Sequence, residues 1–171
     1  MSKDPDRRLV MLAKKGNRSA FGKLVRKYQD QILGLAYDYL GNYDAARDAA
    51  QEVFIKAWDK FDGFGEKSKF STWLYRIAVN QCLDELRKQA VRRSAAKQMQ
   101  THLADLPAPG PPADLFELEK AGLSEAQYTA ILLKYYQDLP VGEIAEIMAC
   151  SEATVRTHLF RAIKKIRLEL D

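Results

Sequence analysis

The sequence predicts an all-α protein with two small helical domains, an N-terminal helical bundle and a C-terminal helix-turn-helix domain, joined by a flexible linker. Three observations predict this fold. Apolar residues recur at steps of three and four along both halves of the chain. No stretch alternates like a β-strand with turn signals at both ends. A proline-rich segment, HLADLPAPGPPADL at 102–115, interrupts the helical pattern between the halves.

The first two long helices are predicted on either side of Gly41-Asn42, which breaks the apolar pattern. Asn17 or Ser19 is suited to be the first N-cap, because their side chains accept hydrogen bonds from free N–H groups. Asp44 is the expected N-cap of the second helix, which ends at Asp62-Gly63-Phe64-Gly65. The residues expected to face the core are Phe21, Leu24, Val25, Tyr28, Ile32, Leu35, Ala36 and Tyr39, followed by Ala45, Ala46, Ala49, Val53, Phe54, Ala57, Trp58 and Phe61.

The next predicted helix, FSTWLYRIAVNQCLDELRK at 70–88, has two different faces, and Ser68 or Ser71 is its expected N-cap. The helical pattern can continue beyond it through Arg92, Arg93 and Lys97. One face carries the apolar residues Tyr75, Val79, Cys82, Leu83 and Leu86. At the same spacing another face carries Trp73, Arg76, Asn80, Asp84 and Arg87. Core packing accounts for the first face and can account for Trp73, but it explains Arg76 and Asn80 poorly.

The proline-rich stretch predicts an extended, semi-stiff connection rather than a folded unit. The predicted boundaries are 1–90 for the first domain, 91–117 for the linker and 118–171 for the second domain. In the second domain, Ser124-Glu125-Ala126-Gln127 fits a capping box. The helix that follows it is expected to turn Tyr128, Ile131, Leu132, Tyr135 and Tyr136 inward.

Two shorter helices complete the second domain and predict a helix-turn-helix. One spans 141–148, Ala149-Cys150-Ser151 makes a turn, and Ser151 is the expected N-cap of the last helix. That last helix carries five basic residues and no acid between Arg156 and Arg167. Arg and Thr at its N-terminal end are suited to base edges and phosphates in a major groove. A solvated helix face or a generic helical hairpin is the alternative interpretation of this pattern.

Composition excludes several classes of protein. The 47% hydrophobic share is too high for a disordered chain, and no apolar run approaches a membrane span or a secretory signal. The two cysteines and two histidines are isolated, so the sequence predicts no metal site and no cofactor. A Gly-rich phosphate loop and a nucleophile with a placed base are both missing. We therefore expect no enzyme, no catalytic residue, no small-molecule substrate and a reducing, cytoplasmic location.

Two blocks of sequence resemble the extracytoplasmic-function sigma factors, a compact group of bacterial transcription-initiation factors. The blocks are Ala20-Phe21, DAAQEVF at 48–54 and FSTWLYRIAVN at 70–80 in the first half, and EIAEI at 143–147 and TVRTHLFRA at 154–162 in the second. Their order and spacing cover nearly the whole chain outside the linker. Two positions depart from the family pattern: Arg47 stands where an acid is usual, and Ala153 where Gly is usual.

The resemblance implies that the 70–88 helix and the loop before it hold the −10 promoter element as it opens. Unstacked bases need flat apolar surfaces and a few hydrogen bonds, and phosphates need cations. The expected surfaces are the rings of Phe64 and Trp73, and Asn80 offers both a donor and an acceptor. The full set of expected −10 residues is Phe64, Lys67, Lys69, Trp73, Arg76, Asn80 and Arg87. Asp84 repels phosphate and is expected to pair with Arg87 or Lys88.

The resemblance also implies docking on core RNA polymerase and recognition of the −35 element. The helix with Asp48, Gln51, Glu52 and Phe54 is expected to dock on the coiled-coil clamp of the largest polymerase subunit. The expected −35 residues are Ser151, Thr154, Arg156, Thr157, Arg161 and Lys164. Core polymerase, promoter DNA and an anti-sigma factor are the expected partners. The protein is expected on the nucleoid when active, or held at the membrane by the anti-sigma factor.

Other classes of function explain only part of the chain. An ordinary helix-turn-helix regulator with a helical interaction domain leaves the 70–80 and 48–54 blocks without a task. A helical adaptor leaves Arg156, Thr157 and Arg161 unexplained. An alternative sigma factor, which binds core polymerase and directs promoter-specific initiation, accounts for both halves.

Overall fold

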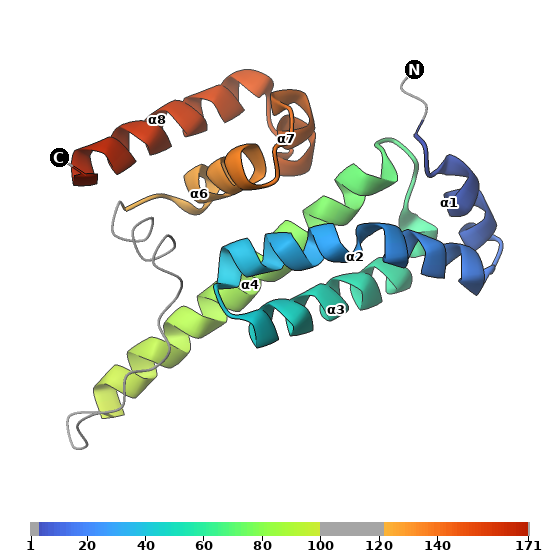
Figure 1. Ribbon diagram of the computed structural model, residues 1–171, viewed down its shortest axis with the longest axis horizontal. Helices are drawn as coiled ribbons and strands as arrows, with labels where there is room; N and C mark the ends of the chain where they lie inside the picture. Colours follow the sequence, from blue (N-terminus) through green and yellow to red (C-terminus); the bar gives the residue numbers. More distant parts are fainter. Residues whose placement is uncertain (1–3, 100–121, 171) are drawn as a thin grey trace.

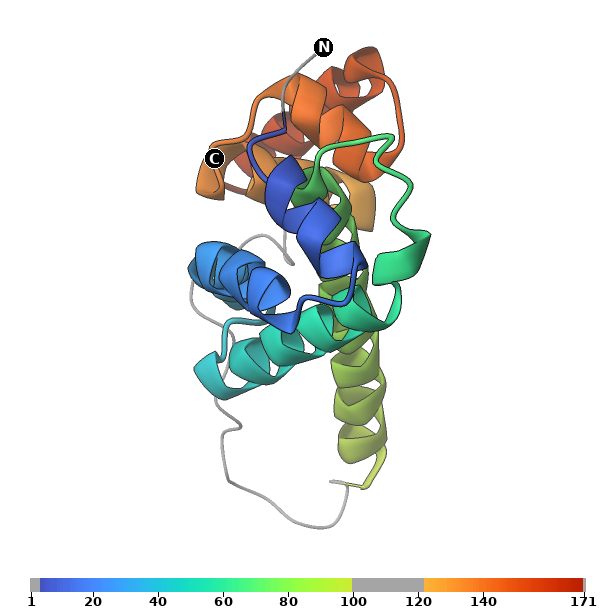
Figure 2. The same ribbon diagram turned by 90° about the vertical axis from the view of Figure 1, so that its right-hand side faces the viewer.

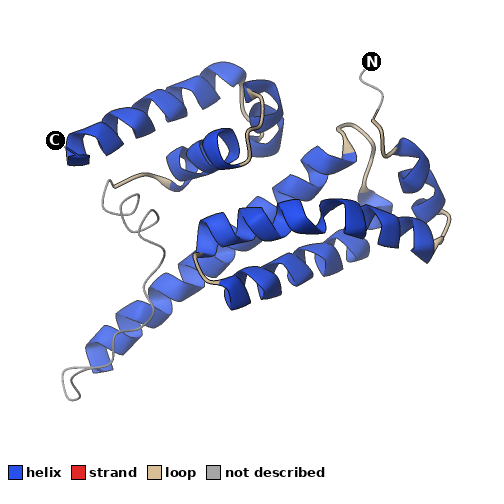
Figure 3. Ribbon diagram, viewed as in Figure 1, coloured by secondary structure: helices blue, strands red, loops and turns tan. Residues whose placement is uncertain are grey.

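The computed structural model describes residues 4–99 and 122–170, and this part of the chain is helical without a strand (Figures 1 and 3). The all-α prediction is confirmed. The helices are α1 (Arg7–Lys14), α2 (Arg18–Leu40), α3 (Tyr43–Asp59), the 3₁₀ turn η1 (Phe61–Gly63), α4 (Phe70–Met99), α6 (Glu125–Ile131), the π-helical turn η3 (Leu132–Tyr136), α7 (Val141–Met148) and α8 (Glu152–Leu170).

The first domain is a bundle in which α2, α3 and α4 pack against one another and α1 covers one end of α2 (Figure 1). Its centre is formed by fully buried side chains such as Leu24, Leu35, Val53 and Leu74. Asn17 caps α2 as predicted, with its Oδ1 accepting the N–H of Ala20 at 3.0 Å. The core of the bundle is therefore formed by the apolar stripes that the sequence shows.

Two predicted helix starts are wrong. Helix α3 begins at Tyr43, and its N-cap is Asn42, whose Oδ1 accepts the N–H of Ala45 at 2.9 Å. Asp44 instead lies in the first turn. The N–H of Phe70 at the start of α4 donates to Oδ2 of Asp4, at 2.9 Å, rather than to a serine nearby. A cap from a residue so distant in sequence cannot be found from local patterns.

Helix α4 is longer than the predicted 70–88 segment and continues to Met99. Its last turns, which carry Arg92, Arg93 and Lys97, project away from the bundle (Figure 2) and belong to the segment that we predicted as linker. The proline-rich stretch at 102–115 lies outside the described residues.

The second domain packs α6 and α7 against α8. The predicted capping box is present, with the N–H of Gln127 donating to Oγ of Ser124 and the N–H of Ser124 donating to Oε1 of Gln127. The prediction for Tyr135 and Tyr136 is wrong, because they are 59% and 47% exposed. The backbone widens at η3, where the N–H of Gln137 donates to the carbonyl of Leu132, five residues back. This turn shifts the helical register away from the predicted stripe.

The helix-turn-helix prediction is confirmed. Ala149 adopts a left-handed conformation, with φ of 52°, and ends α7. Ser151 caps α8, since its Oγ accepts the N–H of Thr154 at 3.1 Å. The inward side of α8 holds Val155, Leu159 and Ala162, all buried. The outward side is therefore free to face a groove of DNA.

The two domains share an interface that joins α2 and α4 to η3 and α7. Oη of Tyr39, a fully buried side chain, donates to Oγ1 of Thr129 at 2.8 Å. The amide of Gln137 donates to the carboxylate of Asp38 at 2.7 Å. Much of this interface is polar, and it borders a pocket of about 300 Å³ that is lined by both domains and open to solvent. Polar, imperfectly filled interfaces are typical of domains that can separate.

None of the helices in the described residues is long and apolar enough to cross a bilayer.

Candidate nucleic-acid interface

Helix α4 carries four of the seven predicted −10 residues on one face, and the loop before it carries Lys67 and Lys69. Because Trp73, Arg76, Asn80 and Arg87 are spaced by three, four and seven residues, they share one face of α4. Asn80 and Arg87 are exposed, whereas Trp73 and Arg76 are half-buried. The two loop lysines come just before the N-terminus of α4, with Lys67 exposed and Lys69 half-buried.

The prediction for Phe64 is wrong, because its ring is only 3% exposed and cannot offer a face to a base. It packs in an aromatic cluster with Phe61, Phe70 and Trp73. The centroids of the Phe64 and Trp73 rings lie 5.0 Å apart, which is a favourable spacing for aromatic contact. Phe64 therefore packs against the inner side of Trp73, and of these two rings only that of Trp73 retains an accessible edge.

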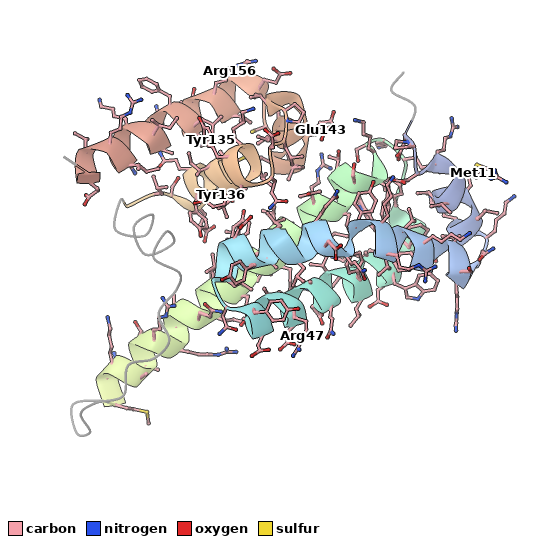
Figure 4. All side chains as sticks on the ribbon, viewed as in Figure 1. Met11, Arg47, Tyr135, Tyr136, Glu143 and Arg156 are labelled. Carbon is pink, nitrogen blue, oxygen red and sulfur yellow. The ribbon has the colours of Figure 1, made fainter. Side chains whose placement is uncertain are left out.

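The second domain contacts three of the four predicted −10 cations. Nζ of Lys69 lies 3.0 Å from Oε1 of Glu143, and Figure 4 shows Glu143 on the side of α7 next to α4. Nε of Arg76 donates to the backbone carbonyl of Glu146 at 2.8 Å. The interaction of Lys69 with the carboxylate of Glu143 raises the lysine pKa. This lysine therefore stays charged, and its half-exposed side chain is paired with an acid.

Arg87 makes the third contact with the second domain. Its guanidinium donates from Nε and Nη2 to the two carboxylate oxygens of Glu125, at 2.9 and 2.6 Å. Nη1 also donates to Asp84 at 2.9 Å, which confirms the expected pairing of Asp84. The hydrogen bonds from Arg87 hold the pKa of Glu125 below its usual range. We use the name interdomain ion pairs for Lys69–Glu143 and Arg87–Glu125.

The outer face of α3 carries three of the four predicted polymerase-docking residues, namely Asp48, Gln51 and Glu52. The side chain of Asp48 is 75% exposed and Gln51 is exposed, whereas Glu52 and Phe54 are half-buried. Phe54 packs against the core, as its inward assignment predicts. Arg47 lies 3.5 Å from Asp44 and 4.0 Å from Asp48. Figure 4 shows Arg47 on the side of the bundle away from the second domain.

Two apolar residues on α3 add to this face and were missing from the prediction. Ile55 is 54% exposed and follows Asp48 by two turns. Trp58, which we expected on the inner side, is 39% exposed, although its ring contacts Phe21 at a centroid distance of 4.8 Å. Exposed large apolar groups between acids are typical of a protein-binding surface. An isoleucine outside the apolar stripe was the available sequence clue.

The predicted −35 residues lie together on α8. Arg156 is 63% exposed and donates to Glu152, one turn earlier, at 2.8 Å (Figure 4). Oγ1 of Thr157 donates to the carbonyl of Ala153. Arg161 and Lys164 are exposed, and they have no ion pair or hydrogen bond within the described residues. Ser151 and Thr154 share a hydroxyl contact of 2.9 Å at the helix start.

Phe160 belongs to the same face of α8, although it was left out of the predicted site. Its side chain is 70% exposed between Arg156 and Arg161. An exposed phenylalanine among cations can make an apolar contact with a thymine methyl group. Its place outside the apolar stripe of α8 was the clue in the sequence.

Among the described residues, no three His, Cys, Asp or Glu side chains gather in a way that could hold a metal ion. Cys82 is buried, and burial raises the pKa of its thiol to about 12, so it stays protonated and unreactive.

Two family models match the chain. Sigma-70 region 2 matches residues 24–92, and sigma-70 region 4 matches residues 116–166. The first match contains α3 and most of α4, and the second contains the helix-turn-helix.

Whole-chain relatives agree with both models. The chain is 35% identical to the ECF RNA polymerase sigma factor SigW of Bacillus subtilis, with 94% of each chain covered. It is 36% identical to the ECF RNA polymerase sigma-E factor of Haemophilus influenzae, with 94% of this chain and 93% of the relative covered.

Solved structures give the same result for the fold. CnrH in complex with the cytosolic domain of CnrY matches with a TM-score of 0.74 at 26% identity, over 97% of each chain. The sigma factor RpoE of Bartonella quintana, in complex with the anti-sigma factor NepR, matches with a TM-score of 0.59 at 26% identity, over 88% of this chain and 96% of that one.

Proposed function

Since the chain belongs to the extracytoplasmic-function sigma factors, we propose that its two domains divide promoter recognition, the first at the −10 element and the second at the −35 element. The protein is an alternative sigma factor that directs transcription initiation. The region 2 match accounts for the half of the chain that an ordinary helix-turn-helix regulator leaves unexplained. The observation that supports the division is the alignment of Trp73, Arg76, Asn80 and Arg87 on one face of α4, with the loop lysine Lys69 contacting the same α7 as Arg76.

In the proposed −10 site each group has a separate task. Trp73 offers an apolar edge for an unstacked base, and Asn80, one turn beyond Arg76, bonds a base edge. Lys67, Lys69, Arg76 and Arg87 neutralise phosphates along the strand. Phe64 has no contact with DNA in this scheme and only supports Trp73.

The proposed site is partly covered in the free protein, because the second domain occupies Lys69, Arg76 and Arg87. DNA and the second domain would compete for the same three cations. Full contact with the −10 strand therefore requires the domains to separate, as they must to span two promoter elements.

In the proposed polymerase contact, the outer face of α3 docks on core RNA polymerase. Asp48, Gln51 and Glu52 supply polar groups and Ile55 an apolar one. This face lies away from the second domain (Figure 1), so polymerase can bind before the domains separate.

We also propose an anti-sigma factor as a partner. CnrH and the Bartonella RpoE were each solved with a second protein, the cytosolic domain of CnrY and the anti-sigma factor NepR. Because core polymerase and DNA are found in the cytoplasm, we propose that the protein acts there.

Run-off transcription with core polymerase on genomic fragments tests the function directly. We expect specific transcripts with the protein present, and only weak binding to the same fragments without polymerase, because each domain contacts few bases and linkage supplies the affinity. Nanomolar, sequence-specific binding by the free protein at physiological salt would contradict this mechanism and favour an ordinary regulator.

Replacing Arg156 or Arg161 by alanine should impair upstream promoter recognition. If the lost guanidinium contacts a base, the cost should be about 1–3 kcal/mol at one promoter position. A lost phosphate contact should instead weaken binding to all sequences alike. Footprinting of the holoenzyme on promoters with single −35 substitutions separates these outcomes. The matched control is Lys165→Ala, because Lys165 lies on the same helix but donates a hydrogen bond to the carbonyl of Gly122. Wild-type footprints for both arginine variants would show that this face of α8 does not contact the −35 element.

A further inference from the structure

The N-terminal segment contacts the loop that carries Lys67 and Lys69 at two points, in its middle and at its end at Phe70. The loop joins α3 to α4 and includes η1. Lys14, the last residue of α1, contacts its middle, and Asp4, just before α1, contacts its end at Phe70. Figure 2 shows α1 beside this connection. Both contacting residues lie outside the 24–92 segment that matches the region 2 model.

Lys14 makes three contacts with the loop through one ammonium group. Its Nζ donates to the backbone carbonyl of Phe64 and lies 5.6 Å from the centroid of the same ring. It also lies 3.7 Å from the carboxylate of Glu66. Glu66 has a φ of 53°, a left-handed conformation that is strained for a residue other than glycine. The ammonium therefore stabilises the point where the loop turns sharply.

Asp4 fixes the C-terminal end of the loop, where α4 begins. Its Oδ2 accepts the N–H of Phe70, the first residue of α4, and its Oδ1 accepts the N–H of Asp6 at 3.0 Å. Asp6 is only 1% exposed and accepts hydrogen bonds from Lys27, at 2.5 Å, and from Tyr28. A buried carboxylate with two partners is costly to move. The cap on α4 is thus anchored to α2 through a rigid connection.

We propose that Asp4 and Lys14 are positioning residues, which fix the α3–α4 loop in the conformation that presents Lys67 and Lys69 to the −10 strand. The two lysines lie between the two anchored points, Glu66 and Phe70. Helix α1 sets the separation of the anchors, because Asp4 and Lys14 lie at its two ends. The inference depends on the −10 role proposed above for this loop.

The test compares Lys14→Met with Lys14→Arg and Lys15→Met in the full chain. Methionine keeps an unbranched apolar chain, one atom shorter than that of lysine, and removes the charge and the donor. Arginine retains both and should restore function. Lys15 is exposed, so Lys15→Met removes the same charge beside the site without touching the loop. Asp4→Ala and Asp4→Asn form a second pair: alanine removes both acceptor oxygens, whereas asparagine keeps one and can retain only one of the two hydrogen bonds.

The first measurement is the ¹⁵N relaxation of the free protein. The heteronuclear NOE of the Gly65, Glu66 and Lys67 amides should fall in Lys14→Met and stay at the wild-type value in Lys14→Arg and Lys15→Met. Unchanged loop amides in Lys14→Met would overturn the positioning role, whatever transcription does.

The second measurement is the rate of promoter opening by the holoenzyme, followed by permanganate reactivity of −10 thymines on a fragment selected by run-off transcription. We expect Lys14→Met and Asp4→Ala to slow opening on the order of tenfold, the effect of one lost charge-assisted hydrogen bond. Polymerase affinity should not change. If the loop loosens but opening keeps its rate, the loop has no −10 role, and that part of the proposed function fails instead.

Discussion

Replacing Asp48 and Glu52 together by arginine is expected to reduce the affinity for core polymerase roughly a hundredfold, because like charges then meet across a docked interface. Asp48 is 75% exposed in the free protein and forms only a 4.0 Å contact with Arg47, so its replacement costs the fold little. Glu52 is half-buried, so the space that its aliphatic stem occupies must accommodate the longer arginine side chain. Fluorescence anisotropy of the labelled protein, titrated with core polymerase, measures the loss.

The control for this prediction has the same change of charge at other places. Asp30→Arg on α2 and Glu169→Arg on α8 replace two exposed acids away from α3. Thermal unfolding should be similar in both double variants. Wild-type polymerase affinity in Asp48→Arg, Glu52→Arg would remove the docking role of this face. Ile55→Ala provides a neutral probe of the same face, since its side chain is 54% exposed.

The fold could be predicted from the sequence where its determinants are local. Apolar periodicity located α2, α3, α7 and α8, and the capping box located the start of α6. The N-cap of α3 was misplaced by two residues, from Asn42 to Asp44, and the other failures have a determinant that is distant or unusual. The cap of α4 comes from Asp4, and a π-helical turn at η3 moves Tyr135 and Tyr136 to the surface. Neither event leaves a periodic pattern in the chain.

The candidate site was predictable as a set of residues but not as a surface. Spacing alone placed Trp73, Arg76 and Asn80 on one face of a helix. Spacing cannot show that the ring of Phe64 turns inward, because a loop residue has no helical register. Nor can it show that Glu125 and Glu143 approach the same face from the other domain. Contacts between domains depend on the tertiary arrangement.

Replacing Glu125 and Glu143 together by glutamine is expected to open the free protein and strengthen its binding to a single-stranded −10 oligonucleotide. Both carboxylates belong to the interdomain ion pairs and compete with phosphates for Lys69 and Arg87. Glutamine has the same shape but no charge, and both changes lie in the second domain, so the proposed −10 face itself is unaltered. If about one molecule in ten is open before the change, complete opening raises the apparent affinity about tenfold.

Two measurements on the same variant separate domain opening from DNA binding. Energy transfer between dyes on the two domains reports the separation, and anisotropy of the labelled oligonucleotide reports affinity. The control Glu152→Gln, Glu169→Gln removes two negative charges from α8 without touching the interface, and it corrects for the general gain in attraction to DNA. Salt gives an independent check. Salt weakens both phosphate contacts and interdomain ion pairs, so the wild-type affinity should fall less steeply with salt than that of the opened variant.

Acid should act on the ion pairs in the same direction as the substitutions. Because Arg87 lowers the pKa of Glu125 in the closed form, this contact is present above the usual glutamate pKa and is lost as pH falls through the lowered value. The separation of the dyes should therefore stay constant around neutral pH and increase only in acid. An unchanged separation in Glu125→Gln, Glu143→Gln would show that the remaining interdomain contacts, such as Tyr39–Thr129 and Gln137–Asp38, hold the domains together without the ion pairs. Opening without a gain in affinity would mean that Lys69 and Arg87 do not bind the −10 strand.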